Sequence, residues 1–312
     1  MDVHTWFARR TYHMDDLDVD DLAARKAAQG MRVSVVLPSR NEVETIGGVV
    51  GAAMALRGQL VDEIVVLDGG STDGTRELAE AAGAQTFDDS EVLGEFGPGL
   101  GKGDALWRSL AVTSGDVVVF VDADIRNPDS RFVWGPLGPL LLDPEIQLVK
   151  GFYERPIQMA GTTYPTGGGR VTELTARPLL NLFWPELAGL AEPLSGEYAG
   201  RRALLESVPF FTGYGVEIGM LIDTLASGGL DVIAQVDLGE RIHTNQPLDA
   251  LSRMAFEIIQ VARRRLAVED LPDRYAQFLR SAGGRLELIE QKVQTTERPP
   301  LRDLLGYARG GV

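Results

Sequence analysis

The sequence contains no cysteine and only three histidines among its 312 residues. The absence of cysteine excludes a disulfide framework, a thiolate metal site and a cysteine nucleophile. No run of 18 or more apolar residues is present, so we expect no transmembrane helix. Residues 1–13 lack the apolar core of a secretory signal peptide, and we therefore expect a cytoplasmic protein.

Acidic residues outnumber basic ones, and this balance argues against some classes of binding partner. The chain has 30 lysine and arginine residues against 45 aspartate and glutamate residues, a formal net charge of −15. Nucleic-acid binders usually carry a basic patch that meets phosphates, and anionic lipid surfaces attract basic segments. We therefore expect neither nucleic acid nor a membrane as a partner. The hydrophobic content of 44% is that of an ordered globular protein.

Short β-branched runs alternate with segments of helical periodicity. The expected strands cover residues 33–38, 64–67, 117–121, 146–153 and 232–236. This alternation predicts an α/β fold, a Rossmann-like and mostly parallel sheet flanked by helices on both faces. Ligands of such sheets bind at the carboxyl ends of the strands.

Three further segments carry local expectations. Asn41, with Glu44 three residues later, matches a capping box at the start of a helix. Helical periodicity continues from residue 248 to 266. The polar tail from residue 294 to 312 is expected on the surface or in a contact with a partner.

Two aspartates follow the most hydrophobic of the expected strands. Asp122 and Asp124 are hard oxygen ligands that suit Mg²⁺ or Mn²⁺, and magnesium sites typically combine one or two carboxylates with substrate phosphates. The alternative is a plain turn, which aspartate also favours. Their place directly after a buried strand favours a metal and diphosphate site.

His243 is the second candidate metal ligand, because neutral imidazole often binds metals. In an extended segment, Arg241, His243 and Asn245 would point the same way. The alternative is an exposed histidine without a ligand role.

Glycine is in excess, with 36 copies, and two glycine-rich loops carry cations. The loop at 94–103 fails the Walker pattern, but it can bring Lys102 to a phosphate as a point charge. At Thr166–Arg170, three glycines precede Arg170 and a helix begins directly after, a pattern typical of an anion site. The alternatives are a mobile loop and a flexible hairpin tip.

Glu217 lies in an apolar, glycine-rich segment, where an unpaired carboxylate is costly to bury. Either it acts on a ligand or it forms a structural salt bridge. Glu197 is a similar but weaker case.

Several motifs in this order resemble one enzyme family, the actinobacterial glucosyl-3-phosphoglycerate synthases, which are retaining glycosyltransferases of the GT-A fold in glycosyltransferase family 81. The mannosyl-3-phosphoglycerate synthases are close relatives. The resemblance covers residues 30–250. It rests on the segments Leu37–Glu42, Leu67–Asp73, Gly101–Trp107, Asp122–Asp124, Thr166–Leu174, Gly213–Gly219 and Arg241–Asn245.

The resemblance implies a role for each matching position. The donor would contact Pro38, Ser39, Arg40, Glu42, Asp68, Gly69, Lys102, Asp122 and Tyr214. The acceptor would contact Gly169, Arg170, Thr172 and Asn245. Asp124 and His243 would bind Mg²⁺ or Mn²⁺ with Asp122 in support, and the catalytic residues would be Glu217, Asp124 and Arg241.

The expected reaction moves glucose from UDP-glucose to the 2-hydroxyl of 3-phosphoglycerate. The family often has serine where Ala123 and Gly69 stand, and its first loop usually differs at Arg40, so GDP-mannose or dual donor use stays open. A non-catalytic nucleotide-sugar-binding protein is the remoter alternative. The first strand is followed neither by the glycine- and arginine-rich loop of a pyrophosphorylase nor by the GxGxxG of a dehydrogenase.

The expected organisation has four parts. Residues 1–30 form a helical extension, 31–150 the nucleotide-sugar half, 151–250 the acceptor half on the same sheet, and 251–312 C-terminal helices and the tail. The resemblance also implies a homodimer.

Overall fold

A computed structural model describes residues 2–159, 162–164, 168–242, 246–267, 273–280, 286–293, 295–304 and 306–307. The helices are α1 Val3–Arg10, α2 Val19–Gln29, α3 Ile46–Met54, α4 Thr75–Ala81, α5 Lys102–Ser109, α6 Arg131–Leu142, α7 Arg177–Phe183, α8 Arg202–Leu205, α9 Val216–Gly228 and α10 Leu248–Arg265. The strands are β1 Thr11–His13, β2 Val33–Ser39, β3 Glu63–Asp68, β4 Gln85–Asp88, β5 Val117–Phe120, β6 Leu148–Glu154, β7 Ile157–Met159, β8 Thr162–Tyr164, β9 Tyr198–Arg201, β10 Phe210–Phe211, β11 Ile233–Glu240, β12 Arg274–Arg280, β13 Leu286–Lys292 and β14 Glu297–Arg298.

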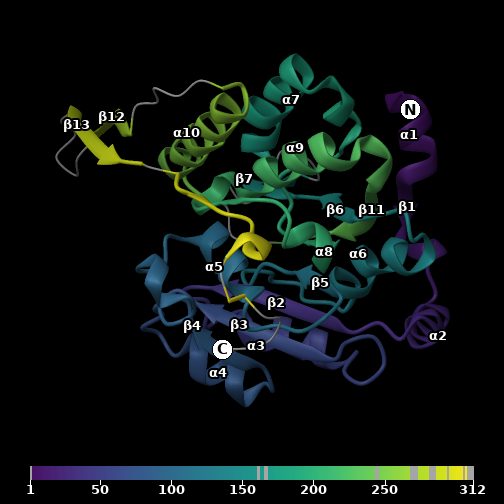
Figure 1. Cartoon of the computed structure of the whole chain (residues 1–312). Helices are drawn as coiled ribbons and strands as arrows, with labels where there is room; N and C mark the ends of the chain where they lie inside the picture. The colour runs from purple at the N-terminus through teal and green to yellow at the C-terminus, as the bar shows by residue number, and fades with distance from the viewer. Residues whose placement is uncertain are drawn as a thin grey trace.

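Eight strands form one central sheet in the order β1-β11-β6-β9-β5-β2-β3-β4 (Figure 1). All neighbours are parallel except β9, which runs antiparallel to both β5 and β6. The predicted α/β fold with a mostly parallel sheet is therefore confirmed. Strands from both halves of the chain join this sheet, and residues 11–13 add an edge strand where only helix was expected.

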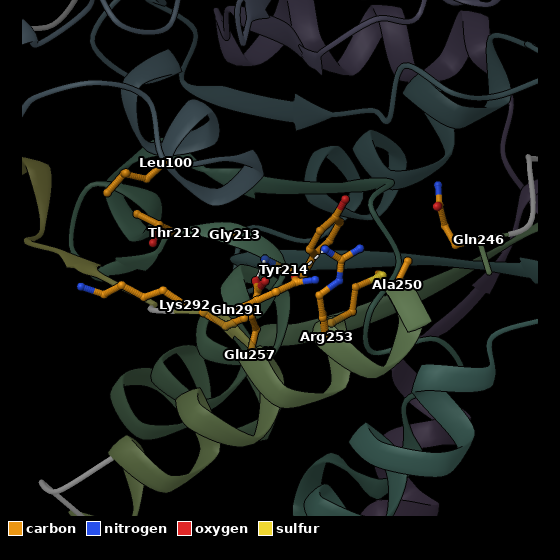
Figure 2. Close-up of a pocket in the computed structure, with 12 residues that line it drawn as sticks. Leu100, Thr212, Gly213, Tyr214, Gln246, Ala250, Arg253, Glu257, Gln291 and Lys292 are labelled. Carbon is orange, nitrogen blue, oxygen red and sulfur yellow. Dashed lines mark hydrogen bonds between the residues drawn. The ribbon is translucent and has the colours of Figure 1, made fainter. Parts of the chain in front are cut away.

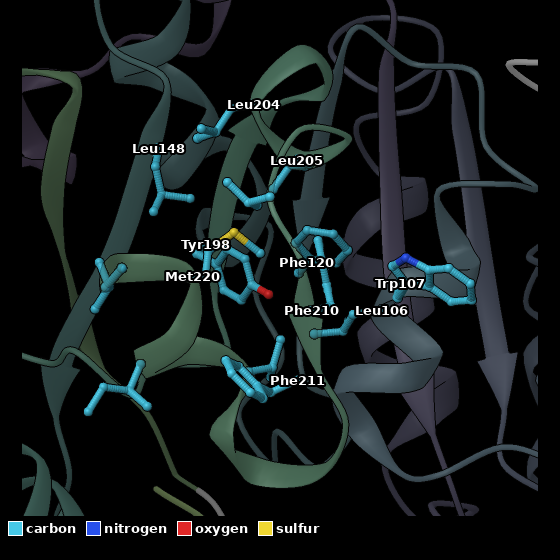
Figure 3. Close-up of a cluster of buried hydrophobic side chains, with 14 of the residues drawn as sticks. Leu106, Trp107, Phe120, Leu148, Tyr198, Leu204, Leu205, Phe210, Phe211 and Met220 are labelled. Carbon is cyan, nitrogen blue, oxygen red and sulfur yellow. The ribbon is translucent and has the colours of Figure 1, made fainter. Parts of the chain in front are cut away.

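Alternate residues of the strands face two separate cores. Along β2, Val36 belongs to one core, while Val35 and Leu37 belong to the other. Helices α5, α9 and α10 cover the first face, where Phe120 and Tyr198 lie at the centre of the cluster and Trp107 lies to one side (Figure 3). Helices α2, α3, α4 and α6 cover the second face. No helix in the described ranges is both long and apolar enough to cross a bilayer.

The predicted capping box at Asn41 is wrong. The helix begins at Ile46, and Asn41 adopts a left-handed φ of 56°. Its side-chain oxygen accepts a hydrogen bond of 3.0 Å from the Thr72 amide instead. Asn41 therefore links the loop after β2 to the loop after β3. The Thr72 amide donates the hydrogen bond that a helix N-terminus would otherwise give to the Asn41 side chain.

The prediction for the C-terminal tail is also wrong in its described part, because the tail packs into the protein beside α5 (Figure 1). Arg298 is 6% exposed and donates to the fully buried carboxylate of Asp104 at 2.6 and 3.0 Å. Asp104 also accepts from Arg108 at 3.1 Å and from the Leu100 amide at 3.0 Å. The tail thus supports the loop and helix that carry Lys102.

We expect Arg298→Ala to destabilise the protein by about 2–4 kcal/mol, because it leaves the buried Asp104 carboxylate short of a cation. Arg302→Ala is the matched control. Arg302 pairs with Asp303, its side chain is 61% exposed, and its loss should cost under about 0.5 kcal/mol. Urea unfolding of both variants measures the difference. Equal unfolding free energies would contradict the supporting role of Arg298.

Candidate functional site

A cavity of about 670 Å³ opens at the carboxyl ends of the central strands. Most predicted site residues line it: Pro38, Ser39, Arg40, Glu42, Gly69, Lys102, Asp122, Asp124, Gly169, Arg170, Thr172, Tyr214, Glu217 and Arg241. His243, Asn245, Thr166 and Gly167 lie outside the described residues. The rule that ligands bind at the carboxyl ends of parallel strands therefore predicted the position of the cavity. The fold brings together residues that lie up to 203 positions apart in the sequence, from Pro38 to Arg241.

Asp68 is the predicted donor residue that does not line this cavity. Its carboxylate accepts hydrogen bonds from the amide and the hydroxyl of Ser71, the former at 2.9 Å. The side chain therefore holds its own loop together, and Gly69 rather than Asp68 faces the cavity.

Lys102 joins two carboxylates at the floor of the cavity. It is the first residue of α5, and its Nζ lies 2.6 Å from Asp122 and 2.8 Å from Glu217. Asp122 follows β5, while Glu217 lies in the first turn of α9. A Cβ at Gly196 would overlap the Asp122 carboxylate, so the absence of a side chain there makes room for it.

Arg241 extends this arrangement from the end of β11. Its Nη2 lies 3.2 Å from Asp122 and 2.7 Å from Asp124, and its Nε lies 3.1 Å from Glu197. Arg241 is 2% exposed and Glu197 is fully buried. Positive and negative groups therefore alternate in one continuous network of ion pairs. Glu197, the weaker of the two glutamate candidates, is part of it.

The network shifts the acidities of its members in opposite directions. Burial acts to raise the pKa of Asp122, but the charges of Lys102 and Arg241 outweigh it and lower this pKa to about 2. Burial raises the pKa of Glu197, against the opposing charge of Arg241. The pKa of Glu42 is raised by burial and then by the negative charge of Asp124.

The donor set suits a divalent cation at Asp124. Arg241 binds one carboxylate oxygen of Asp124, and the other makes no hydrogen bond with any described residue. Both oxygens of Asp122 already contact cations, the Lys102 ammonium and the Arg241 guanidinium. Among the described residues, no three His, Asp or Glu side chains cluster as a complete metal site, and the predicted ligand His243 lies outside them.

Two further arginines line the same cavity. Arg170 follows Gly169, whose φ is +67°, and it donates to the Gln246 carbonyl at 2.9 Å. Arg155 directly follows β6, donates to the Tyr153 hydroxyl at 3.0 Å and lies 3.6 Å from Glu192. Sequence reasoning missed Arg155, although the strand-end rule applies to it as well.

Beneath the floor lies a buried lysine that sequence reasoning also missed. Lys150 donates to the Ser195 carbonyl at 2.5 Å, and its Nζ lies 4.3 Å from the centre of the Tyr198 ring. Burial lowers the pKa of Lys150 to about 8, although the charge of Glu217 opposes this shift. The position of Lys150 in the middle of a strand gave no signal of a polar role.

Asp89 is the third residue that sequence reasoning missed. It follows β4, is 6% exposed and lines the cavity beside Gly69 and Gly99. No hydrogen bond or ion pair links its carboxylate to any described side chain or amide. Burial, and then the charge of Asp88, raise its pKa to about 6.

A smaller cavity of about 410 Å³ adjoins the first (Figure 2). Arg253 and Glu257 from α10 line it together with Gln291 and Lys292 from β13. Glu257 accepts a hydrogen bond of 2.7 Å from the Tyr214 amide, and Tyr214 lines both cavities. The smaller cavity is thus a side pocket of the larger one.

Known proteins match this chain over almost its whole length. The family model described as Glycosyl transferase family 2 matches residues 34–159. The glucosyl-3-phosphoglycerate synthase of Mycolicibacterium smegmatis is 48% identical, over 96% of this chain and 98% of that protein. The enzyme of the same name from Petrotoga mobilis is 44% identical, over 96% and 95%.

Two solved structures give the same result. The mannosyl-3-phosphoglycerate synthase from Rubrobacter xylanophilus is 42% identical with a TM-score of 0.89, over 97% of this chain and 98% of that one. The glucosyl-3-phosphoglycerate synthase from Mycobacterium tuberculosis, in complex with Mn²⁺, UDP-glucose and phosphoglyceric acid, is 46% identical with a TM-score of 0.84, over 94% and 98%. The predicted GT-A architecture agrees with these structures.

The unpartnered Asp89 carboxylate predicts a stabilising substitution. Its folded pKa of about 6 lies above the ordinary 3.8, so its contribution to stability is lost as pH rises through this interval. We expect Asp89→Asn to raise the free energy of unfolding at pH 7.5 by roughly 1–3 kcal/mol and to give no gain near pH 4.

Glu91→Gln, an exposed glutamate two residues further along the chain, is the control, and it should change the free energy of unfolding by less than about 0.5 kcal/mol at both pH values. Urea unfolding at the two pH values measures both variants. An Asp89→Asn protein no more stable than the parent at pH 7.5 would show that the carboxylate has a partner.

Proposed function

Because the chain belongs to the family of the glucosyl-3-phosphoglycerate synthases, we propose that it transfers glucose from UDP-glucose to the 2-hydroxyl of 3-phosphoglycerate. One observation carries the proposal. A single cavity is lined both by the acidic pair Asp122 and Asp124 and by a second group of charged residues, the arginines Arg155 and Arg170. The first suits a metal-bound nucleotide diphosphate, and the second suits a small phosphorylated acid.

Asp124 would hold Mg²⁺ or Mn²⁺ together with His243, with Asp122 in support. The relative from Mycobacterium tuberculosis was solved with Mn²⁺. When bound, the cation neutralises charge on the leaving diphosphate. Lys102 and Arg241, both held in place by Asp122, supply further positive charge near it.

Arg170, Arg155 and Thr172 would bind the phosphate and carboxylate of 3-phosphoglycerate. Arginine forks match both groups, and Thr172 adds a hydroxyl that now donates to Glu192 at 3.2 Å. This binding orients the 2-hydroxyl toward the sugar. Under this proposal, residues 31–150 bind mainly the donor and residues 151–250 mainly the acceptor.

Retention of configuration follows if the acceptor attacks from the face that the diphosphate leaves. The C1–O bond to the diphosphate breaks, the acceptor oxygen bonds to C1, and its proton passes to the departing phosphate oxygen. Glu217 is 4% exposed and fixed by Lys102, so its carboxylate can orient the sugar and stabilise positive charge on it.

Nucleotide release tests the proposed function. The protein is incubated with UDP-glucose and Mn²⁺ or Mg²⁺, with and without 3-phosphoglycerate, and the glucosylated product is identified by mass. We expect UDP release that depends on the acceptor and on the cation. UDP release that does not depend on 3-phosphoglycerate would contradict the transferase proposal. Binding of UDP-glucose without release of UDP would favour the non-catalytic alternative.

Glu217→Gln should lower kcat by about 10²-fold or more with a smaller change in the KM for 3-phosphoglycerate, because the loss falls on the charged transition state. Glu77→Gln, an exposed glutamate in α4, is the matched control and should keep full turnover. Urea unfolding checks that both variants fold. Near-normal turnover of Glu217→Gln would remove Glu217 from the mechanism.

GDP-mannose is the alternative donor, and the similarity to the mannosyl-3-phosphoglycerate synthase from Rubrobacter xylanophilus supports testing it in parallel. The proposal also includes a cytoplasmic location and a homodimer. The large apolar side chains of Leu174, Leu182 and Phe183 are exposed around α7 and offer a surface for a second copy. A sedimentation mass equal to one chain would contradict the dimer.

A further inference from the structure

A chain of hydrogen bonds joins two arginines that line the cavity. Arg155 donates to the Tyr153 hydroxyl at 3.0 Å, and that hydroxyl donates to one Glu197 oxygen at 2.5 Å. The other Glu197 oxygen accepts from Arg241 at 3.1 Å, and Arg241 also donates to Asp124 at 2.7 Å. The arginine proposed for the acceptor is therefore connected to the arginine proposed for the donor through two side chains, Tyr153 and Glu197.

Tyr153 contacts both arginines through its ring as well. The ring centre lies 4.9 Å from the guanidinium carbon of Arg155 and 5.6 Å from that of Arg241. Gly151 lies two residues before Tyr153 on the same side of β6, and a Cβ there would lie 2.8 Å from the Glu197 carbonyl oxygen. The absence of a side chain at Gly151 thus allows Glu197 to approach the strand that carries Tyr153.

The Tyr153 hydroxyl has the chemistry that this position needs. A tyrosine hydroxyl can accept one hydrogen bond and donate another. Burial raises the pKa of Tyr153, so the proton stays on the hydroxyl and is available to Glu197. Tyr153 is 5% exposed and Glu197 is fully buried, and hydrogen bonds in a dry chain of this kind strengthen one another.

Arg155 has a donor left for a ligand. It lines the cavity, and its Nε is buried without a hydrogen-bond partner among the described residues. A buried N–H without an acceptor is costly, and an anionic oxygen of the substrate would remove this cost. Glu192 lies 3.6 Å from Arg155 and accepts from Thr172 at 3.2 Å, so it links these two proposed acceptor residues.

We propose that Tyr153 is a positioning residue that couples the acceptor site to the donor site. A diphosphate near Arg241 competes for its guanidinium and leaves Glu197 more charge to share with the Tyr153 hydroxyl. The hydroxyl oxygen then becomes a better acceptor and fixes Arg155 for the acceptor substrate. By linkage, the acceptor favours donor binding to the same extent. The inference rests on the proposed function, because it takes Arg155 and Arg241 to face the two substrates.

Calorimetry measures this coupling without turnover. Binding of 3-phosphoglycerate to the whole protein is measured with and without UDP and Mn²⁺. We expect UDP and Mn²⁺ to tighten this binding by about fivefold or more in the parent protein. In Tyr153→Phe the two affinities should agree within about twofold, because both links of the chain are lost. Misplaced substrates should also lower kcat by roughly 10–100-fold, with a smaller change in the KM for UDP-glucose.

Tyr198→Phe is the matched control. Tyr198 is 1% exposed within the cluster of Figure 3, and its hydroxyl has no hydrogen-bond partner among the described residues. The same substitution there should keep the coupling of the parent. Glu197→Gln interrupts the chain at its next member, because an amide has one acceptor oxygen in place of the two that Glu197 uses. Urea unfolding checks that each variant folds, and Glu197→Gln decides the question if Tyr153→Phe does not.

The outcomes separate this inference from the proposed function. If the parent shows no acceptor-dependent UDP release, the proposed function is refuted, whereas the calorimetric ratios still decide the role of Tyr153. Normal turnover without coupling in the parent, or equal coupling in Tyr153→Phe and Tyr198→Phe, overturns the inference alone. No binding of 3-phosphoglycerate overturns both. Loss of coupling in Tyr153→Phe and Glu197→Gln, with coupling kept in Tyr198→Phe, supports the inference.

Discussion

Two cations hold four carboxylates together at the floor of the cavity, and the rest of the site depends on this network. Burying so many charges is tolerable only because each has an opposite neighbour within hydrogen-bonding distance. The six groups still carry two more negative charges than positive ones. Asp124 contributes a carboxylate oxygen that makes no hydrogen bond with any described residue, and this oxygen could bind a divalent cation.

Four members of the network come from four separate elements of the fold, which restricts their movement. Lys102 begins α5, Asp122 follows β5, Glu217 begins α9 and Arg241 follows β11. Each element is fixed by one of the two cores, so no member can move without disturbing a packed layer. The C-terminal tail adds a support from outside the sheet. It holds Asp104, two residues after Lys102, through Arg298.

The fold and most of the site were predictable from local patterns. Buried strands have a clear signal, and in a parallel sheet their carboxyl ends must meet, so Asp122 and Arg241 were found although they lie far apart in the chain. Partners across the chain were not predictable in this way. Arg298 is polar and near the C-terminus, and nothing in its surroundings indicates a buried ion pair with Asp104, 194 positions away.

The sequence predicted Asp68 as a cavity residue and missed Asp89 for a similar reason. Both follow strands, and the sequence could not tell which carboxylate turns inward. Ser71 lies three residues after Asp68 and captures it, whereas Ser90 binds Asp88 and leaves Asp89 without a local partner. The difference follows from the short-range hydrogen bonds that each turn makes, a competition that spacing alone does not resolve.

In the site, some of the chain's many glycines make room for its acidic side chains. A Cβ at Gly99 would overlap the carboxylate of Asp89, one at Gly196 that of Asp122, and one at Gly213 that of Glu257. All three carboxylates line the cavity. An acid that borders a ligand needs space beside the facing backbone, and glycine supplies it without adding apolar surface. The glycines at these three places therefore make room for charged side chains, and at Gly213 the φ of +74° is a second reason for glycine.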